Sequence, residues 1–315
     1  MTLDVSDLRR HRPLLLSHCY RMLGSSCDAE DAVQETMIRA VRGSDGFGGR
    51  SSVRRWLTVI ATNVCIDMLR GRRRRERPVA RPPGRPSDPV VFEAAETWLE
   101  PMPGAWLPSL DDPQKQVAQR QSVSLAFVAA LQVLTPTQRA ALLLTQVLGW
   151  TAQEVAEQLE TTVAAVNSAN QRARATLTDH PGLEAHAAPD HEAARRYVEA
   201  FVRFDLDALV QLLTDDVRFD MPPIALWVQG PAHVRAFLGE GPGRDCEGSV
   251  AVPLSVNGGP GFAQYRHGGK TPWGIVALTL RGDRIAGITT FLDTERLFPM
   301  FEVPPVWTRN HEPAR

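Results

Sequence analysis

Apolar residues recur at helical spacing through the first 77 residues and predict three helices. The apolar positions of the first helix are Leu8, Leu14, Leu15, Tyr20, Met22 and Leu23. A second helix is expected from Ser26 or Asp28 to about Arg42, because acids follow the capping residue in the first turn. Its apolar face is expected to hold Ala32, Val33, Met37, Ala40 and Val41. A third, heavily buried helix is expected from Ser52, with Trp56 in its core-facing set.

Helical periodicity returns between residues 119 and 180. Thr135, Pro136 and Gln138 form a capping-box signal, and Thr151 with Glu154 repeats it. The pattern then predicts a short helix over 153–159, a break over 160–162 and a second helix over 163–177. Two short helices joined by a tight turn, the second rich in exposed polar residues, predict a helix-turn-helix.

Residues 78–118 contain nine prolines, a density that excludes long helices and predicts a linker. The segment nevertheless holds several large apolar residues, which a fully solvated tether would not need. These residues are Phe92, Trp98, Leu99, Trp106 and Leu107. Part of the linker is therefore expected to dock on a surface, whereas Arg81 and Arg85 are expected to be its solvated end.

Residues 190–308 change character, from one or two helices to β-branched strands separated by Gly and Pro turns. A helix is expected over 191–213 and a short one over 231–238. Strands are expected over 215–223, 250–256, 262–267, 274–280 and 285–291, with a hairpin at 281–284. Helices followed by a curved antiparallel sheet predict an α+β cone with a pocket.

Composition and charge narrow the class of protein. The 315 residues, 43% of them hydrophobic and 23% charged, fit a globular protein of two or three domains. We expect no signal peptide, no membrane span, no disulfide framework and no metal site from the four cysteines, and a cytoplasmic location. The net charge of −1 conceals an arginine-rich stretch, because residues 39–85 hold 13 arginines and three acids. Such a local cationic field predicts a polyanionic partner.

Three motifs in order then resemble one family. Residues 28–40 (DAEDAVQETMIRA) resemble the polymerase-binding helix of bacterial RNA polymerase sigma factors. Residues 50–70 and the arginine run after them resemble the promoter-melting region of the extracytoplasmic-function (ECF) group, and 134–177 resemble that group's second DNA-binding domain. The remainder resembles a SnoaL-like domain, so the whole chain resembles the sigma factors that carry a C-terminal SnoaL-like fusion. The 98–103 motif WLEPMP and the ending at 290–299 fit that subgroup.

The resemblance implies a multidomain fold with two all-α sigma domains, a three-helix bundle and a helix-turn-helix, and an α+β SnoaL-like or ketosteroid-isomerase-like cone. The expected boundaries are 1–77 for region 2, 78–118 for the linker, 119–182 for region 4 and 190–308 for the SnoaL-like domain. The implied partners are core RNA polymerase, through its β′ clamp and β flap regions, and promoter DNA. No cofactor is implied.

The resemblance also assigns residues. The polymerase-contact set is Asp28, Glu30, Asp31, Gln34 and Glu35. The −10 set is Arg54, Arg55, Asn63, Asp67, Arg70, Arg72, Arg73, Arg74 and Arg75, whose cations suit single-stranded DNA and whose Asn63 and Asp67 could read base edges. The −35 set is Thr162, Ala164, Asn167, Ser168, Gln171, Arg172 and Arg174, in which amides suit adenine and arginines suit guanine or phosphate. A satisfied buried amide is the alternative for Asn63.

Two residues depart from the family's pattern. Glu160 stands where the turn of a helix-turn-helix often has Gly, so a left-handed conformation there would cost about 1 kcal/mol. Asn170 stands where an apolar residue is usual, which predicts either a looser core or an Asn170 that faces DNA.

The cone leaves two functional readings open. Tyr197 and Asp220 match the hydrogen-bond donor and the base of ketosteroid isomerase, but Val276 stands near the position of its second, protonated aspartate. The candidate pocket for a small-molecule ligand is Tyr197, Asp220, Trp227, Tyr265, His267 and Trp273. We therefore expect no catalytic residue and a cone that regulates the sigma factor in cis. The alternative is a bifunctional protein whose cone binds or converts a metabolite.

Overall fold

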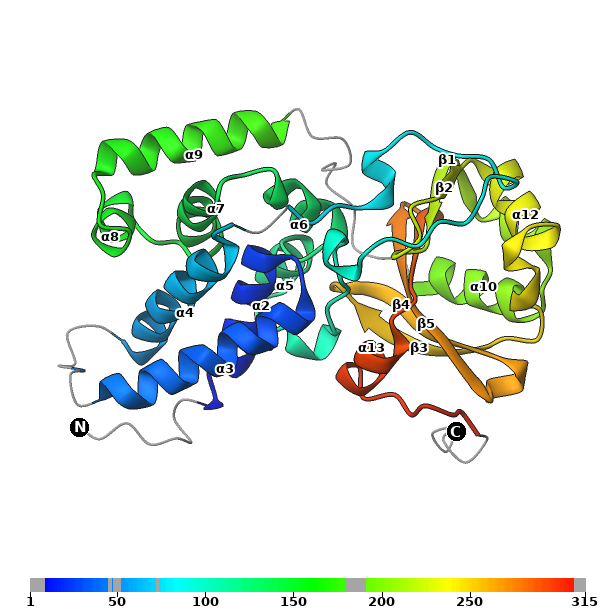
Figure 1. The fold of residues 1–315 in the computed structure, drawn as a ribbon, viewed down its shortest axis with the longest axis horizontal. Coiled ribbons are helices and arrows are strands. Elements are labelled where there is room, and N and C mark those ends of the chain that lie inside the picture. Colours follow the sequence, from blue (N-terminus) through cyan, green and yellow to red (C-terminus); the bar gives the residue numbers. More distant parts are fainter. Residues whose placement is uncertain (1–8, 45–46, 48–51, 72–73, 179–190, 309–315) are drawn as a thin grey trace. The chain divides into compact units, whose positions relative to one another are not determined.

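The computed structural model describes residues 9–44, 47, 52–71, 74–178 and 191–308. The chain forms two compact units. The first comprises residues 1–75 and 105–184, and the second comprises 76–104 and 185–315 (Figure 1). Most of the proline-rich connector thus folds with the C-terminal part of the chain and not with the helices that it joins.

The three predicted N-terminal helices are present as α2 (Arg12–Leu23), α3 (Ser26–Gly43) and α4 (Val53–Leu69). Serine side chains fix the starts of the last two, because Ser25 accepts a hydrogen bond from the Asp28 amide and Ser52 accepts one from the Arg55 amide. Fully buried apolar residues from all three helices pack between them. These are Leu15, Leu16, Tyr20, Met22, Ala29, Ala32, Leu57, Ala61 and Val64.

The predicted helix-turn-helix is also present in the first unit. Its helices are α5 (Pro113–Gln121), α6 (Leu125–Gln132), α7 (Pro136–Leu142) with a π-helical turn at Leu143–Val147, α8 (Ala152–Gln158) and α9 (Val163–Thr178). Both capping boxes form, at Thr135 with Gln138 and at Thr151 with Glu154. Glu160 adopts a φ of 49° in the turn between α8 and α9, so a non-glycine residue does occupy the left-handed conformation there.

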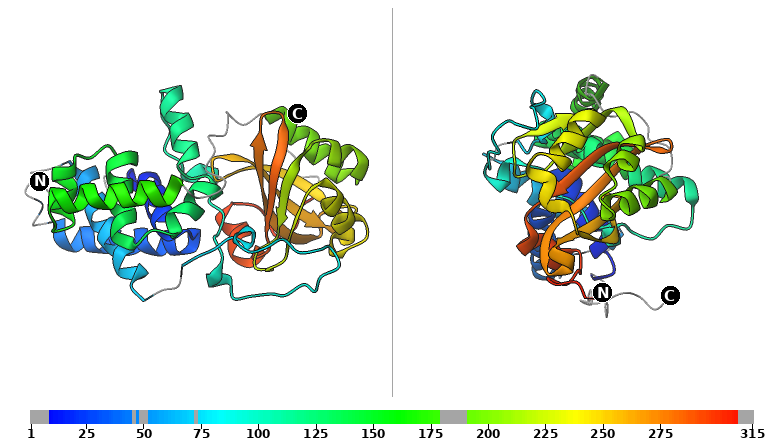
Figure 2. Two further views of the ribbon diagram at one scale, coloured as in Figure 1. Left: turned by 90° about the horizontal axis from the view of Figure 1, so that it is seen from above. Right: turned by 90° about the vertical axis from the view of Figure 1, so that its right-hand side faces the viewer.

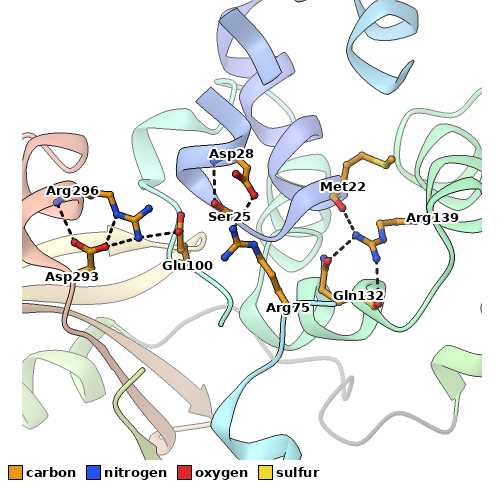
Figure 3. A network of polar contacts seen from close by, with 9 residues as sticks. All are labelled: Met22, Ser25, Asp28, Arg75, Glu100, Gln132, Arg139, Asp293 and Arg296. Carbon is orange, nitrogen blue, oxygen red and sulfur yellow. Dashed lines mark hydrogen bonds and ion pairs between the residues drawn. The ribbon is translucent and has the colours of Figure 1, made fainter. Parts of the chain in front are cut away.

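Two buried arginines join α2 to the helices after the connector. The Arg21 guanidinium donates to the Ser122 carbonyl and hydroxyl oxygens. The Arg139 guanidinium donates to the carbonyl oxygens of Met22, Gln132 and Leu134 and to Gln132 Oε1 (Figure 3). Burial lowers the pKa of each arginine to about 10, so both remain cations that neutral oxygens solvate.

The second unit is the predicted α+β cone, built on one six-stranded sheet of order β2-β1-β6-β5-β4-β3 (Figure 1). Only the β1–β6 pair is parallel. The strands are β1 (Leu213–Asp220), β2 (Trp227–Gln229), β3 (Val250–Val256), β4 (Gly259–Arg266), β5 (Thr271–Arg281) and β6 (Arg284–Phe291). The helices are α10 (His191–Val202), α11 (Leu206–Gln211), α12 (Pro231–Gly239) and α13 (Thr294–Met300), with short 3₁₀ turns between strands. Strand β2 and helix α13 were not predicted from the sequence.

The pairing registers assign residues to the two faces of the sheet. Directly opposed residues project to the same face. Phe219 pairs with Val228 and Ile288, and these residues belong to the core that includes Tyr197 of α10. Asp220, one residue further, pairs with Trp227 and Thr289 and therefore lies on the opposite face. Helices α10 to α12 cover the first face (Figure 2), whereas α13 packs on β5.

The connector covers part of this second face. We call residues 76–104 the strap. Its first part reaches the sheet through Arg77, which contacts Asp220 and Thr289, and through the Arg81 carbonyl, which accepts a hydrogen bond from Trp227 Nε1 at 2.8 Å. Its last part pairs with the β3–β4 turn, where Met102 and Asn257 exchange hydrogen bonds. The strap thus contacts the sheet from edge strand β2 to edge strand β3.

The strap refines the predictions for the linker. Trp98, Leu99 and Met102 are buried within the second unit, as a docked linker requires, but Phe92 is 65% exposed. Arg81 is only partly solvated: it forms two hydrogen bonds with Glu93, at 2.6 and 3.0 Å, and lies over the Trp98 ring. The Arg85 side chain is exposed, as expected. Helix α5 begins at Pro113, inside the predicted linker.

The cysteines, the possible metal ligands and the hydrophobicity of the helices also bear on the class of protein. All four cysteines are free thiols, and Cys19, Cys65 and Cys246 are buried. The described residues contain no cluster of three or more His, Cys, Asp or Glu side chains suited to a metal ion. Within the described part of the chain, no helix combines the length and the apolar character needed to cross a bilayer.

Replacing Glu160 with Gly is expected to stabilise the helix-turn-helix, because Gly adopts a positive φ without steric cost. A gain of about 1 kcal/mol would slow amide hydrogen exchange in α8 and α9 about fivefold, as measured by mass spectrometry. The matched control is Glu157→Gly, which places the same residue on the α8 helix and should accelerate exchange by a similar factor. Faster exchange in the Glu160→Gly protein would contradict the account of this turn.

Candidate functional site

The outer face of α3 carries the predicted polymerase-contact set and two exposed apolar residues. Asp31 and Gln34 are exposed. Glu35 accepts a hydrogen bond from Arg39 at 2.7 Å, and Glu30 pairs with Arg12 at 2.9 Å. Ile38 and Val41 are 40% and 51% exposed. Positions 31, 34, 38 and 41 recur every three or four residues and therefore share one face of the helix.

Val41 was predicted to lie on the buried face of the helix with Ala32, Val33 and Ala40, but its side chain is exposed. The latter three are buried, as predicted. Ile38 was missed altogether. Its signal was its spacing, because it lies four residues after Gln34 and three before Val41. We call the exposed residues Asp31, Gln34, Ile38 and Val41 the α3 stripe. A surface that combines polar and apolar side chains suits contact with a protein better than a purely acidic surface does.

Asp28 and Arg75 were assigned to two different surfaces, but the structure pairs them. Arg75 Nη2 lies 2.8 Å from Asp28 Oδ2 (Figure 3), and the side chains are 17% exposed for Asp28 and 11% for Arg75. Asp28 also begins α3 with its amide bound to Ser25. The pair anchors the end of the arginine run to the start of α3, so neither group is freely presented to a partner in this form.

The remaining −10 residues lie mostly on the exposed side of α4 and the chain after it. Arg54, Asn63, Asp67, Arg70 and Arg74 are exposed. The exposure of Asn63 excludes the alternative of a buried amide. Asp67 is flanked by two arginines, because it pairs with Arg70 at 3.1 Å and Arg39 at 3.6 Å. Arg72 and Arg73 lie outside the described residues. Trp56, expected in the core, is half-buried and packs against Phe47.

Residues of the helix-turn-helix cover part of this α4 surface. Arg55 forms an ion pair with Glu154, and its guanidinium carbon lies 4.3 Å from the centroid of the Trp150 ring. Gln158 Nε2 lies 3.5 Å from Asn63 Oδ1. The hydrogen bond from Arg55 is the largest cause that lowers the pKa of Glu154 to about 2. Two of the predicted −10 residues thus contact the helix-turn-helix in this form. The sequence did not reveal Glu154 and Trp150 as partners of Arg55, or Gln158 as the partner of Asn63.

Helix α9 presents the predicted −35 residues to solvent. Ala164, Asn167, Gln171, Arg172 and Arg174 are exposed, and Ser168 is half-buried. Thr162 caps the helix, since its hydroxyl accepts a hydrogen bond from the Ala165 amide at 3.1 Å. The opposite side of α9 is buried through Val166, Ala169, Asn170 and Ala173. At 100° per residue the two sets occupy opposite arcs of the helix.

Of the two expectations made for Asn170, the structure contradicts the one that turns its side chain towards DNA. Its side chain is 8% exposed, so it does not face DNA. Its Oδ1 accepts a hydrogen bond from the Thr145 hydroxyl at 3.3 Å. This buried polar contact replaces the apolar packing usual at the position and ties α9 to the π-helical turn before α8.

The six residues of the candidate pocket do not line one cavity. Tyr197 is 1% exposed, packs in parallel on Phe201 in the core beneath α10, and burial raises its pKa well above the usual range. Asp220 lies on the other face of the sheet, so these two side chains do not form one base-and-donor pair. Trp227 binds the Arg81 carbonyl, and Tyr265 donates to the Pro304 carbonyl. His267 is exposed beside Thr271, and Trp273 lies under the Arg266 guanidinium.

A small cavity near the β1–β2 edge has walls of Phe219, Met221, Ile224, Leu226, Trp227, Val228 and Phe237. It contains no volume that would hold a water molecule. The cone is therefore filled by its own side chains at this place.

Comparison with known proteins identifies three domains in the chain. Residues 8–75 match the model of sigma-70 region 2, residues 124–177 match that of sigma-70 region 4, and residues 194–291 match that of the SnoaL-like domain. The chain belongs to the ECF RNA polymerase sigma factors, because a member of that class is 43% identical over 93% of this chain.

That relative is the ECF RNA polymerase sigma factor SigG of Mycobacterium tuberculosis, of which the match covers 82%. SigJ of the same organism is 31% identical over 75% of this chain and 70% of its own length. The crystal structure of SigJ matches with a TM-score of 0.59 and 26% identity, over 96% of this chain and all of that chain. The family, the helical sigma domains and the SnoaL-like fold predicted from the sequence are thus confirmed.

The contact between Arg55 and Glu154 predicts an unusual titration. Because the folded pKa of Glu154 is lowered to about 2 from its usual 4.5, the contact should persist above pH 4.5 and weaken as the pH falls toward 2. A ¹³C carboxyl titration should give a midpoint near 2 for Glu154. Arg55→Ala should raise that midpoint towards the usual value, whereas Arg54→Ala on the same helix should leave it unchanged. An unshifted midpoint in the Arg55→Ala protein would show that the ion pair is not what lowers this pKa.

Proposed function

We propose that this chain recruits core RNA polymerase through the outer face of α3 and directs it to promoters in the cytoplasm, with α4 and the arginines after it on the −10 element and α9 on the −35 element. The observation that carries the proposal is that α9 has one polar, exposed side and one apolar, buried side. Its Asn, Gln and Arg side chains face solvent, while Val166, Ala169 and Ala173 bury the other side. A helix with this division can enter the major groove and read base edges there.

The described form must open before α4 binds DNA. Arg55 and Asn63 contact Glu154, Trp150 and Gln158, so the same atoms are unavailable to a DNA strand. Polymerase binding to α3 and DNA binding to α9 would both favour the open form, provided that each binds that form more tightly.

We propose further that the second unit regulates initiation in cis through the strap. The support is that the strap connects the two sigma regions along the chain and is packed into the SnoaL-like unit, with Trp98 and Leu99 each 2% exposed and Met102 fully buried. Deletion of residues after 182 would strip the cover from these side chains. Point variants that release the strap are therefore a sharper test than truncation.

Turnover of a metabolite by the cone, the alternative function, receives no geometric support from Tyr197 and Asp220, which lie on opposite faces of the sheet. The proposal of a promoter-specificity factor is tested by run-off transcription with core polymerase and a library of genomic promoters. Specific transcripts that depend on this chain are expected, and their absence on every template would refute it.

Polymerase recruitment should depend on the apolar part of the α3 stripe. The double variant Ile38→Glu, Val41→Glu is expected to weaken binding to core polymerase at least tenfold, because it places two carboxylates where apolar contact is made. Val202→Glu is the matched control, since Val202 is 40% exposed on α10 of the other unit. Core binding is measured by fluorescence anisotropy. Equal affinity of the double variant and the wild type would exclude this face as the contact.

Promoter discrimination should depend on the amides of α9. Gln171→Ala and Asn167→Ala are expected to relax the preference at individual −35 base pairs by about 1–3 kcal/mol. Arg174→Ala should instead weaken binding to all sequences and reduce the salt dependence by about one ion. Binding selection on randomised −35 elements measures both effects. Unchanged preferences in both amide variants would show that α9 does not read bases through them.

A further inference from the structure

Arg77 closes a buried acidic site on the second face of the sheet. Its Nη2 atom lies 3.0 Å from Asp220 Oδ2 and 2.9 Å from the Thr289 hydroxyl. Asp220 and Thr289 are opposed across the parallel β1–β6 pair, so the acceptor atoms sit side by side on rigid strands. The Asp220 side chain is fully buried and that of Arg77 is 13% exposed. The guanidinium therefore covers the carboxylate and is itself near the surface.

The pair is incomplete on both sides. A single nitrogen of Arg77 makes both contacts, and its buried Nε has no hydrogen-bond partner. Asp220 Oδ1 is also buried and has no partner. Burial raises the pKa of Asp220 and Arg77 opposes that rise. A guanidinium fits a carboxylate best through two parallel hydrogen bonds, and a buried polar atom left without one is costly. The tethered Arg77 does not achieve the two-bond geometry.

We propose that Asp220 and Thr289 form a guanidinium-binding site, which the chain fills with its own Arg77 and from which a free guanidinium compound displaces that residue. A free molecule is not held by the strap backbone, so it can turn to bind both oxygens of Asp220. The site takes a planar guanidinium in preference to an ammonium, because only the planar group donates in parallel to two carboxylate oxygens.

Displacement of Arg77 would remove the first side-chain contact between the strap and the sheet, while the Glu76 backbone stays bound to Thr97 and Leu99 within the strap. The next hydrogen bond to the sheet, between the Arg81 carbonyl and Trp227 Nε1, is four residues further along. Trp227 of β2 pairs with Asp220 of β1, so the residues that bind Arg77 and Arg81 lie on neighbouring strands. This inference rests on the proposed regulation through the strap for its consequence, but the site itself is tested without polymerase or DNA.

The test is chemical rescue in the full-length chain. Arg77→Ala should leave Asp220 buried without its hydrogen-bonded cation, with only the more distant charge of Arg218 to act on it, and raise amide exchange in residues 76–84 and β1 at least tenfold. Methylguanidinium at about 20 mM should restore at least threefold protection in β1, whereas equal methylammonium or sodium chloride should not. The double variant Arg77→Ala, Asp220→Asn should show no rescue. If Arg77→Ala does not fold, Arg77→Gln takes its place, since it keeps a long polar side chain without the charge.

Displacement is measured on the wild type. A tethered arginine competes at an effective concentration in the millimolar range, so about 100 mM methylguanidinium should accelerate exchange in residues 76–81 at least threefold. Exchange in β4 and β5 should not change, which separates displacement from general denaturation. Rescue by methylammonium to the same extent, or no rescue of either single variant, would overturn the guanidinium site. Rescue without acceleration in the wild type would overturn displacement.

Discussion

The second unit depends on one constraint, which is that the face of the six-stranded sheet not covered by helices α10 to α12 must also be shielded from water. Helices α10 to α12 bury one face, and a sheet whose other face carries buried residues such as Ala263, Ile275 and Phe291 needs a cover there as well. Helix α13 and the chain after it supply part of that cover, since Phe298 and Trp307 pack against Tyr265, and the strap, with Trp98, Leu99 and Met102 buried, covers another part. The connector between two DNA-binding regions has thereby become part of the hydrophobic structure of a third domain. Its position is set by packing, and it is not free to vary as a solvated linker would be.

Polar contacts specify where the strap lies. The exchange between Met102 and Asn257 fixes its last turn, and Arg296 links Glu100 to Asp293 at the start of α13 (Figure 3). Gly104 is required by space, because a Cβ there would lie 2.2 Å from Ser255 Oγ. Within the first unit, Arg21 and Arg139 act in the same manner, since each inserts a buried cation among neutral oxygens of a neighbouring element. Burying a cation without a carboxylate is tolerated only where the acceptors are already positioned.

Local signals explain how much of the fold could be predicted. Each of these signals lies within about ten residues of sequence. They are the capping boxes at Thr135 and Thr151, helical periodicity and strand alternation, and the elements that they predicted are present. The apolar residues of the strap predicted that it docks, but not where, because its contacts with the sheet join residues more than a hundred positions apart. The same limit applies to the site. Asn63 and the α9 residues were assigned from the family resemblance and their side chains are exposed, whereas the pairing of Asp28 with Arg75 and of Arg55 with Glu154 joins residues 47 and 99 positions apart. Val41 was misplaced because a helical period does not say where the neighbouring helix ends.

The docked strap also limits how far apart the two sigma regions can lie. As an extended chain, its 29 residues would span up to about 100 Å. Held on the sheet, the same residues span only the distance between the strap's two fixed ends, and the further reach before α5 comes from residues 105–112. In the proposed arrangement, the DNA between the −10 and −35 elements sets the distance that the two sigma regions must span. Attachment of the strap therefore bears on which spacer lengths one molecule can bridge, a selectivity that comes from chain length and needs no contact with any base.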